Sequence, residues 1–304
     1  MAPPEGAPAE SLLARCTFPP SGTPLACAVS GGPDSLALLV LAVAAGCAVT
    51  AIHVDHGLRP GSATEGEVVV AAAARLGACF RGVRVEVGPG PNLEARARGA
   101  RRAALPGGTA TGHTMDDQAE TVFVNLLRGA GLDGLAAMRP GPEHPLLALR
   151  RSETHALCGA SGLEPVCDPS NDDPRFVRNR VRHELLPLAS AIAGRDLVPV
   201  LARQAGLLAD ESDLLDELAT GIDASDAAAL ASAPAALARR ATRRWLRGPD
   251  PHPPDLAAVE RVLAVARGQM AATDVAPGVR VRRRRGSLSS EPIAPEASGS
   301  VGAR

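Results

Sequence analysis

The stretch Ser30-Gly31-Gly32-Pro33-Asp34-Ser35 lies between a short apolar run at 25–29 and an apolar segment of helix-like composition at 36–45. Its glycines let the backbone turn tightly and point N–H groups inward, which makes a nest for an anion beside a helix N-terminus. The helix dipole adds attraction for phosphate, and proline suits the first helical turn. Asp34 can hold a cation that offsets phosphate charge, and the two serine hydroxyls can reach phosphate oxygens. An ordinary capped strand-to-helix turn is the alternative, but this combination favours a phosphate site.

Short apolar segments alternate with helical ones on both sides of this stretch. We expect strands at 25–29, 49–54, 83–87 and 108–111, and helices at 36–45, 65–76, 94–104 and 116–128. Such alternation implies a parallel sheet with helices on both faces. The expected fold class is therefore α/β, with a doubly wound, Rossmann-like N-terminal domain. Ligands of such sheets bind at the carboxyl ends of the strands.

Composition divides the chain into regions. We expect a flexible, Pro/Ala/Glu-rich N-terminus at 1–20, the doubly wound domain at 21–192, a smaller helical domain at 193–290 and a disordered tail at 291–304. Within the helical domain the only expected strand lies at 279–281.

The charge composition excludes some chemistry. The 304 residues include 32 Lys+Arg, all of them arginine, against 33 Asp+Glu, and no lysine occurs. Schiff-base chemistry on the protein and a Walker-A loop are therefore excluded, because both need a lysine. The net charge of −1 argues against a wholly basic surface but leaves room for local arginine clusters. We find no signal sequence and no apolar stretch of membrane-spanning length, so no membrane partner and a cytoplasmic location are expected.

Polar residues also follow the second expected strand. Asp55 and His56 lie just past it in His53-Val54-Asp55-His56-Gly57-Leu58-Arg59. In a doubly wound sheet this place faces a bound nucleotide. A polar loop with a satisfied histidine is the alternative.

The fourth expected strand leads into Thr111-Gly112-His113-Thr114-Met115-Asp116-Asp117-Gln118-Ala119-Glu120-Thr121. Thr114 and Asp117 have the spacing of a capping box, which is a structural role. Capping does not explain His113, nor Asp116 and Glu120, which share one helix face. Like charges repel there unless a metal or a basic group lies between them.

Arginines gather in three further places. Arg96, Arg98, Arg101 and Arg102 lie on the helix after Asn92, and Arg128 closes the helix that starts at 116. Arg178, Asn179, Arg180 and Arg182 lie on an expected helix at 175–188, where Arg178 and Arg182 share a face. Arg239, Arg240, Arg243, Arg244 and Arg247 surround the single tryptophan. Such groups suit phosphates and RNA. Solvated faces, a helix C-terminal charge and, for the last group, pairing with the acidic segment 210–226 are the alternatives.

These motifs carry a family resemblance. Ser30–Ser35 resembles the SGGxDS signature of the PP-loop ATP pyrophosphatases. The motifs at 53–59 and 111–121, Leu126-Leu127-Arg128-Gly129, Asp168-Pro169-Ser170-Asn171 and Arg178-Asn179-Arg180-Val181-Arg182 follow in matching order. Together they resemble the tRNA(Ile)-lysidine synthetase family, from about residue 25 to 186. Because the chain stops soon after Arg285, it is similar to a short form of that family.

The resemblance implies an ATP-dependent ligase. ATP would bind Ser30–Ser35 with Mg²⁺, and O2 of the wobble cytidine in the isoleucine tRNA with a CAU anticodon would attack the α-phosphate. Free L-lysine would then attack C2, release AMP and give lysidine, which changes codon specificity from AUG to AUA.

The resemblance also implies roles for individual residues. Asp34, His113 and Asp117 would serve catalysis, with Asp34 and Asp117 on the metal, and Asp55, Asp116 and Asp117 are candidate bases for the lysine ammonium. His56, Arg98, His113 and Arg128 would contact ATP with Ser30–Ser35, and Arg178, Asn179, Arg180 and Arg182 the target nucleotide. Independently of the resemblance, the dense arginine stripe of the helical domain predicts tRNA contacts for Arg240 and Arg244, because backbone contacts supply most non-specific affinity.

Other PP-loop enzymes are the alternatives. A tRNA thiolase would commonly use paired cysteines, whereas the closest two cysteines here, Cys158 and Cys167, are nine residues apart. An amidating nucleotide synthetase needs an ammonia supply, and a catalytically inactive tRNA-binding protein would not need Asp34, His113 and Asp117. The oligomeric state (a homodimer is one option), the lysine-carboxylate contacts, the choice between Asp116 and Asp117 as metal ligand, and discrimination against methionine tRNA stay open.

Overall fold

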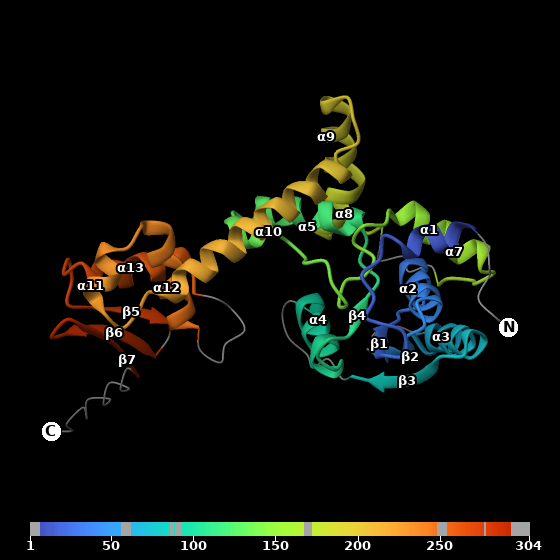
Figure 1. Ribbon diagram of the computed structural model, residues 1–304, viewed down its shortest axis with the longest axis horizontal. Coiled ribbons are helices and arrows are strands. Elements are labelled where there is room, and N and C mark those ends of the chain that lie inside the picture. Colours follow the sequence, from blue (N-terminus) through green and yellow to red (C-terminus); the bar gives the residue numbers. More distant parts are fainter. Residues whose placement is uncertain are drawn as a thin grey trace, which may run out of the picture. The chain divides into compact units, whose positions relative to one another are not determined.

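The computed structural model describes residues 7–55, 62–85, 88, 93–166, 172–247, 254–276 and 278–292. The chain forms two compact units, Met1–Ala209 and Asp210–Arg304 (Figure 1). The units meet within α10 (Val198–Thr220), whereas the sequence analysis placed a domain boundary at 192/193.

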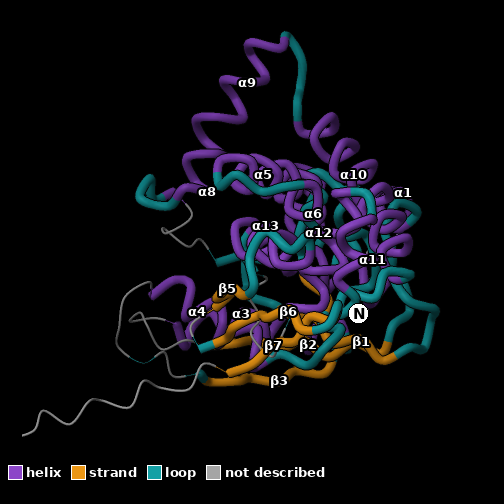
Figure 2. Tube along the Cα trace, turned by 90° about the vertical axis from the view of Figure 1, so that its left-hand side faces the viewer, coloured by secondary structure: helices purple, strands orange, loops and turns teal. Residues whose placement is uncertain are grey.

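A parallel sheet forms the centre of the first unit. Its strands are β1 (Pro24–Ala28), β2 (Ala48–Asp55), β3 (Cys79–Arg84) and β4 (Ala110–Thr111), in the order β3-β2-β1-β4. Leu25 lies opposite Val49, and Ala28 opposite Thr111. The predicted α/β fold is confirmed, and the strands are drawn in orange in Figure 2.

The strand order creates a switch point between β1 and β4. From β1 the chain runs through α2 (Pro33–Ala44) to β2 and through α3 (Ser62–Leu76) to β3, and α4 (Leu93–Ala104) then returns it to the other side of β1. Right-handed crossovers require α4 on the face opposite α2 and α3. Loops that leave β1 and β4 therefore diverge, and the Ser30–Ser35 loop lies at that point.

Helix α2 is the centre of the first core. Its residues from Ser35 to Ala42 are all buried, as expected of a helix that is apolar on every side. The sheet covers one side, and α1 (Ala7–Leu13) and α7 (Arg151–Ala160) also pack on the helix. Its polar residues Asp34 and Ser35 occur only in the first turn, so they face the switch point.

One expectation for the first unit was wrong, and one predicted helix contains an irregular turn. Residues 7–20, expected to be flexible, contain α1, because Ala9 and Leu12 bury themselves in the core and Arg15 pairs with Glu153 of α7 at 2.6 Å. The helix expected at 175–188 is confirmed: α8 (Val177–Arg180), a π-helical turn, η2 (Val181–Leu185), and α9 (Leu186–Ala193) follow one another without a break. Pro187 near the start of α9 has no N–H, which removes one regular helical hydrogen bond at this junction.

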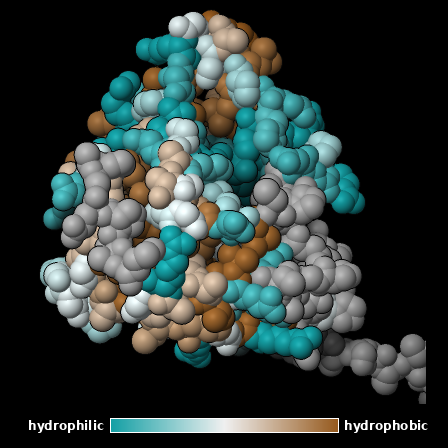
Figure 3. Space-filling view, turned by 90° about the vertical axis from the view of Figure 1, so that its right-hand side faces the viewer, coloured by the Kyte–Doolittle hydropathy of each residue, from teal (hydrophilic) through white to brown (hydrophobic). Residues whose placement is uncertain are grey.

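The predicted helices of this unit otherwise occur with small shifts. The helix that carries the 111–121 motif is α5 (Met115–Leu127), and α6 (Leu132–Leu135) follows it. The outer part of α9 exposes Leu188 and Ile192, and hydrophobic surface gathers at the top of the face in Figure 3. Among the described helices none is alone long and apolar enough to span a membrane; the bent pair 177–193 and 198–220 passes by length and composition only.

The second unit contains strands as well as helices. After α11 (Ala227–Ser232), α12 (Ala235–Leu246) and α13 (Leu256–Ala266), β5 (Ala272–Ala276), β6 (Val279–Arg284) and β7 (Ser287–Pro292) form an antiparallel sheet. The sequence analysis predicted one short strand and began a disordered tail at 291, which lies inside β7. These strands bury few apolar side chains, mainly Val281 and Leu288, so their composition gives little strand signal. Residues 293–304 of the expected tail lie outside the described residues.

Gly112 tests the close approach of β4 to α2. A Cβ at this position would lie 2.7 Å from the Asp34 carbonyl oxygen and 3.1 Å from Ser35 Cα. We expect Gly112→Ala to lower the free energy of unfolding by about 1–3 kcal/mol, because backbone has to move. Gly159→Ala is the control, since a Cβ there meets nothing within 4 Å. Equal unfolding midpoints for the two variants in a denaturant titration would contradict the packing described here.

Candidate active site

The Ser30–Ser35 loop is built by its own side chains. Ser30 N–H donates to Ser35 Oγ at 3.2 Å, and Ser35 Oγ donates to the Gly32 carbonyl at 2.8 Å. Gly31 has a φ of +89°, a conformation that favours glycine, and its carbonyl accepts from Val166 N–H at 2.9 Å. Ser35 is buried, so its hydroxyl shapes the loop. The first N–H groups of α2 lack intrahelical acceptors, as at any helix start, and are therefore available to an anion; the anion nest expected at this place stays a prediction.

Three carboxylates converge beside this loop on one guanidinium. Arg151, at the start of α7, lies 3.0 Å from Asp117 Oδ1 through Nη2 and 2.9 Å from Glu120 Oε1 through Nη1. Its Nε lies 3.6 Å from Asp34 Oδ2. Arg151 therefore joins the first turn of α2 to α5.

Two more arginines complete the group. Glu120 is fully buried, and its oxygens accept from Arg178 Nε at 2.8 Å and Arg182 Nε at 2.7 Å. Arg178 Nη2 also lies 3.0 Å from Asp117 Oδ1. We call Asp34, Asp117, Glu120, Arg151, Arg178 and Arg182 the carboxylate–arginine cluster. Its formal charges cancel, which a buried group of this size requires.

The cluster shifts the pKa values of Asp34 and Asp117 in opposite directions. Burial opposes ionisation of Asp117, but the charges of Arg151 and Arg178 outweigh it and lower the pKa of Asp117 to about 2. Burial raises the pKa of Asp34, and the neighbouring Asp117 raises it further, against a hydrogen bond from Thr154 and the charge of Arg151. Divergent pKa values in one pocket are typical of catalytic sites.

Asp116 and Asp117 point to different partners. Asp117 Oδ2 accepts from Thr114 N–H at 2.9 Å in the predicted capping box, while its Oδ1 belongs to the cluster. Asp116 accepts from Arg150 Nε and Nη2, both at 3.1 Å, and from Arg151 N–H at 2.8 Å. Asp116 therefore fastens α5 to the start of α7, and Asp117 is the aspartate that shares a guanidinium with Asp34.

His113 is held in one tautomer by Thr111. The Thr111 hydroxyl lies 3.0 Å from the Glu143 carbonyl, 2.7 Å from His113 Nδ1 and 2.8 Å from His144 Nδ1. A carbonyl can only accept, so in the arrangement in which the single hydroxyl proton goes to Glu143, both Nδ1 atoms donate to the Thr111 oxygen. Desolvation lowers the pKa of His113 to about 4 and also lowers the pKa of His144, so both rings are neutral. In this arrangement His113 Nε2 carries no proton and can accept a hydrogen bond.

The remaining predicted residues are more dispersed. Asp55 ends β2 and is half-buried, and Arg128 is exposed at the end of α5. His56 and the side chain of Arg98 lie outside the described residues.

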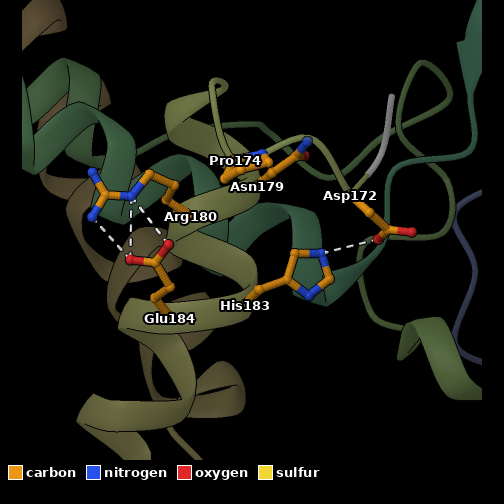
Figure 4. Close-up of a pocket in the computed structure, with 6 residues that line it drawn as sticks. All are labelled: Asp172, Pro174, Asn179, Arg180, His183 and Glu184. Carbon is orange, nitrogen blue, oxygen red and sulfur yellow. Dashed lines mark hydrogen bonds and ion pairs between the residues drawn. The ribbon is translucent and has the colours of Figure 1, made fainter. Parts of the chain in front are cut away.

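The 178–182 segment divides between two faces. Arg180 pairs with Glu184 at 2.9 Å in the exposed pocket of about 150 Å³ shown in Figure 4, while buried Asn179 donates to the Asp173 carbonyl. Arg178 and Arg182 turn to Glu120 instead, as their helical spacing predicted.

Arginines of α12 form ion pairs and hydrogen bonds within the protein, including the pairing with the acidic segment 210–226 that was given as the alternative to tRNA binding. Arg240 pairs with Asp216 at 2.6 Å and keeps only 10% of its side chain exposed, and Arg244 donates to the Ala219 carbonyl at 2.8 Å. Arg239 pairs with Glu260 at 2.5 Å. Arg240 and Arg244 thus connect α12 to the last turns of α10. The pair between Arg240 and Asp216 is the expected pairing with the acidic segment 210–226.

The sequence analysis missed the residues of α7. Arg151 bridges the cluster, Arg150 holds Asp116, and Thr154 donates its hydroxyl to Asp34 Oδ1. A signal existed, because two adjacent arginines at a helix start are opposed by the helix dipole and therefore need anionic partners.

Fold and site together define a PP-loop nucleotide-binding protein, and residues 9–189 match the family described as a PP-loop domain. Similar proteins narrow the class. A tRNA(Ile)-lysidine synthase of Nocardia farcinica is 41% identical over 90% of this chain and 93% of its own length. A tRNA(Ile)-lysidine synthase of Mycolicibacterium paratuberculosis is 44% identical over 72% of this chain and 73% of its own length. The chain belongs to the tRNA(Ile)-lysidine synthase family. A tRNA thiolase structure from Methanococcus maripaludis is similar in fold, with a TM-score of 0.51, 19% identity and coverage of 66% of this chain and 77% of that one.

Glu120 tests the energetics of the cluster. Glu120→Gln keeps the shape but leaves Arg178 and Arg182 without their main anion, so we expect a loss of about 3–5 kcal/mol in the free energy of unfolding. The control is Glu184→Gln, which breaks only the exposed pair with Arg180 and should leave the free energy of unfolding close to that of wild type. Similar stabilities of the two variants would show that the cluster contributes nothing specific.

The titration of His113 tests the assigned tautomer and the burial of its ring. Its pKa of about 4 lies below the ordinary 6.5, so the unfolded chain binds the proton more readily between these values. The contribution to stability is therefore complete above pH 6.5 and is lost as the pH falls toward 4. We expect nitrogen-15 NMR to find His113 neutral, with its proton on Nδ1, down to about pH 4. Titration near 6.5, or a proton on Nε2, would contradict the site geometry.

Proposed function

We propose that this chain uses ATP to join free L-lysine to C2 of the wobble cytidine in the isoleucine tRNA with a CAU anticodon. The observation that carries the proposal is Asp34, which lies on the phosphate loop and shares Arg151 with Asp117, in a chain that covers 93% of a relative named for this activity. The cytoplasm, where tRNA is modified, is the proposed location.

The reaction needs two displacements. Cytidine O2 attacks the α-phosphate of ATP and pyrophosphate leaves; the ε-amine of lysine then attacks C2 and AMP leaves with O2, while the amine loses its proton. The chain's part is to position the phosphates on the Ser30–Ser35 loop and to neutralise charge. Neutral His113 Nε2, close enough to Asp117 to feel its charge, is the acceptor that we propose for nucleotide or lysine N–H groups.

The acidic residues suit Mg²⁺. No group of three His, Cys, Asp or Glu side chains among the described residues would hold a metal by itself. Mg²⁺ is commonly bound by one or two carboxylates together with substrate phosphates and water, so Asp34 and Asp117 form an adequate set. When bound, the ion would neutralise phosphate charge.

The macromolecular contacts are also proposals. Arg180 is the accessible arginine of the 178–182 segment, with 61% of its side chain exposed, and its solvated pair with Glu184 is readily exchanged for an RNA phosphate. Arg128 is likewise exposed. Arg178, Asn179 and Arg182 would act near the target nucleotide through the cluster, and Arg240 and Arg244 would support tRNA binding by holding α12. A homodimer is the oligomeric state that we propose to test by light scattering.

Lysine incorporation tests the function. Wild-type protein with ATP, Mg²⁺, labelled lysine and a transcript of the isoleucine tRNA should transfer label to RNA. Asp34→Asn should reduce incorporation at least about 100-fold, which is the usual effect of losing an electrostatic catalytic group, and leave tRNA binding intact. Asp223→Asn, at an exposed turn of the second unit, is the control. Pyrophosphate release without lysine incorporation would favour another PP-loop enzyme, and loss of tRNA binding in Asp34→Asn would make that residue structural.

A further inference from the structure

Arg151 occupies the place between the two proposed metal ligands. Its guanidinium lies 3.0 Å from Asp117 Oδ1 and 3.6 Å from Asp34 Oδ2, and 18% of the side chain is exposed. It is the first residue of α7, where the helix dipole disfavours a cation. The carboxylates, and not α7, therefore hold the guanidinium in place.

The oxygens of Asp117 have no capacity left for a metal. Oδ2 accepts from the backbone and hydroxyl of Thr114, both at 2.9 Å, and Oδ1 accepts from Arg151 and Arg178, both at 3.0 Å. An ion on Oδ1 would have to replace one of these guanidiniums. Arg178 and Arg151 both also contact Glu120, at 2.8 and 2.9 Å, but of the two only Arg151 reaches Asp34 as well, at 3.6 Å. Arg151 is therefore the cation that an incoming metal displaces.

We infer that Arg151 is an exchangeable counter-cation that binds the phosphates of a nucleoside triphosphate once a divalent cation has taken its place at Asp34 and Asp117. The inference rests on the proposed function, because it uses the same ATP and metal site.

Charge gives the freed guanidinium its new partner. A guanidinium that leaves Asp34 and Asp117 keeps only Glu120, which it shares with Arg178 and Arg182. With a divalent ion added, the cluster carries a net positive charge and needs a further anion, since uncompensated charge in a partly buried site is costly. The anion that arrives with the metal is the phosphate chain, on the loop that carries Asp34. Arginine binds phosphate as a two-pronged donor. The exchange keeps the charges compensated, because the divalent ion would bind Asp34 and Asp117 and Arg151 would pair with the phosphates.

Binding without turnover tests this exchange. Mn²⁺ binding by electron paramagnetic resonance and Mg²⁺-ATP binding by calorimetry, both without tRNA or lysine, are compared for wild type, Arg151→Met and Arg15→Met. We expect Arg151→Met to bind Mn²⁺ alone about ten-fold more tightly, because the competing cation is gone, and ATP at least about ten-fold more weakly, because a charge-assisted contact is lost. Arg15→Met, which loses the ion pair with Glu153 of α7 and lies outside the carboxylate–arginine cluster, should match wild type in both.

Arg151→Lys keeps the proposal testable if the methionine variant fails to fold. It retains the charge and loses the two-pronged donor, so Mn²⁺ affinity should stay near that of wild type while ATP affinity falls. Unchanged ATP and Mn²⁺ affinities in either Arg151 variant, with wild-type lysine incorporation, would overturn the exchange and leave the proposed function standing. If the wild-type protein neither binds Mn²⁺-ATP nor incorporates lysine into RNA, both the exchange and the proposed function are overturned.

Discussion

Neutrality of the carboxylate–arginine cluster is the constraint on which the rest of the site depends. Asp34, Asp117 and Glu120 meet at the end of the sheet, and Glu120 is fully buried there. Such carboxylates are tolerated only with cations that satisfy their hydrogen bonds. The chain provides one arginine each from α7, α8 and η2, so these later segments have to return to the switch point between β1 and β4.

Arginine is well suited to this task. One guanidinium, that of Arg151, reaches Asp117, Glu120 and Asp34 through three different nitrogens. A lysine ammonium is a point charge and cannot provide this planar bridge. The absence of lysine from the chain is thus compatible with a buried acidic site, and the amine that the proposed reaction consumes has to come from solution.

Local signals were sufficient to predict the fold of the first unit and part of its site. The Ser30–Ser35 loop, the Thr114–Asp117 capping box and the shared face of Arg178 and Arg182 depend on neighbours within a few residues. Arg151 could not be assigned in this way, because its partners lie 31 and 34 residues earlier in the sequence and meet it only in the folded chain.

The sequence did not predict α1 or most of the strands of the second unit, because these segments have little apolar patterning. The strands β5, β6 and β7 bury little apolar surface, and their edges carry arginine and serine. Helix α1 was hidden by a Pro-rich start, although its Leu12 packs in the core. In both cases tertiary contacts override local composition.

A crystal structure with Mg²⁺ and a non-hydrolysable ATP analogue would test the central claim most directly. The account predicts phosphates on the Ser30–Ser35 loop, the ion on Asp34 and Asp117, and the Arg151 guanidinium turned from these carboxylates to the phosphates. Nucleotide bound away from the loop, or a cluster that keeps all its ion pairs with the phosphates and ion in place, would contradict it.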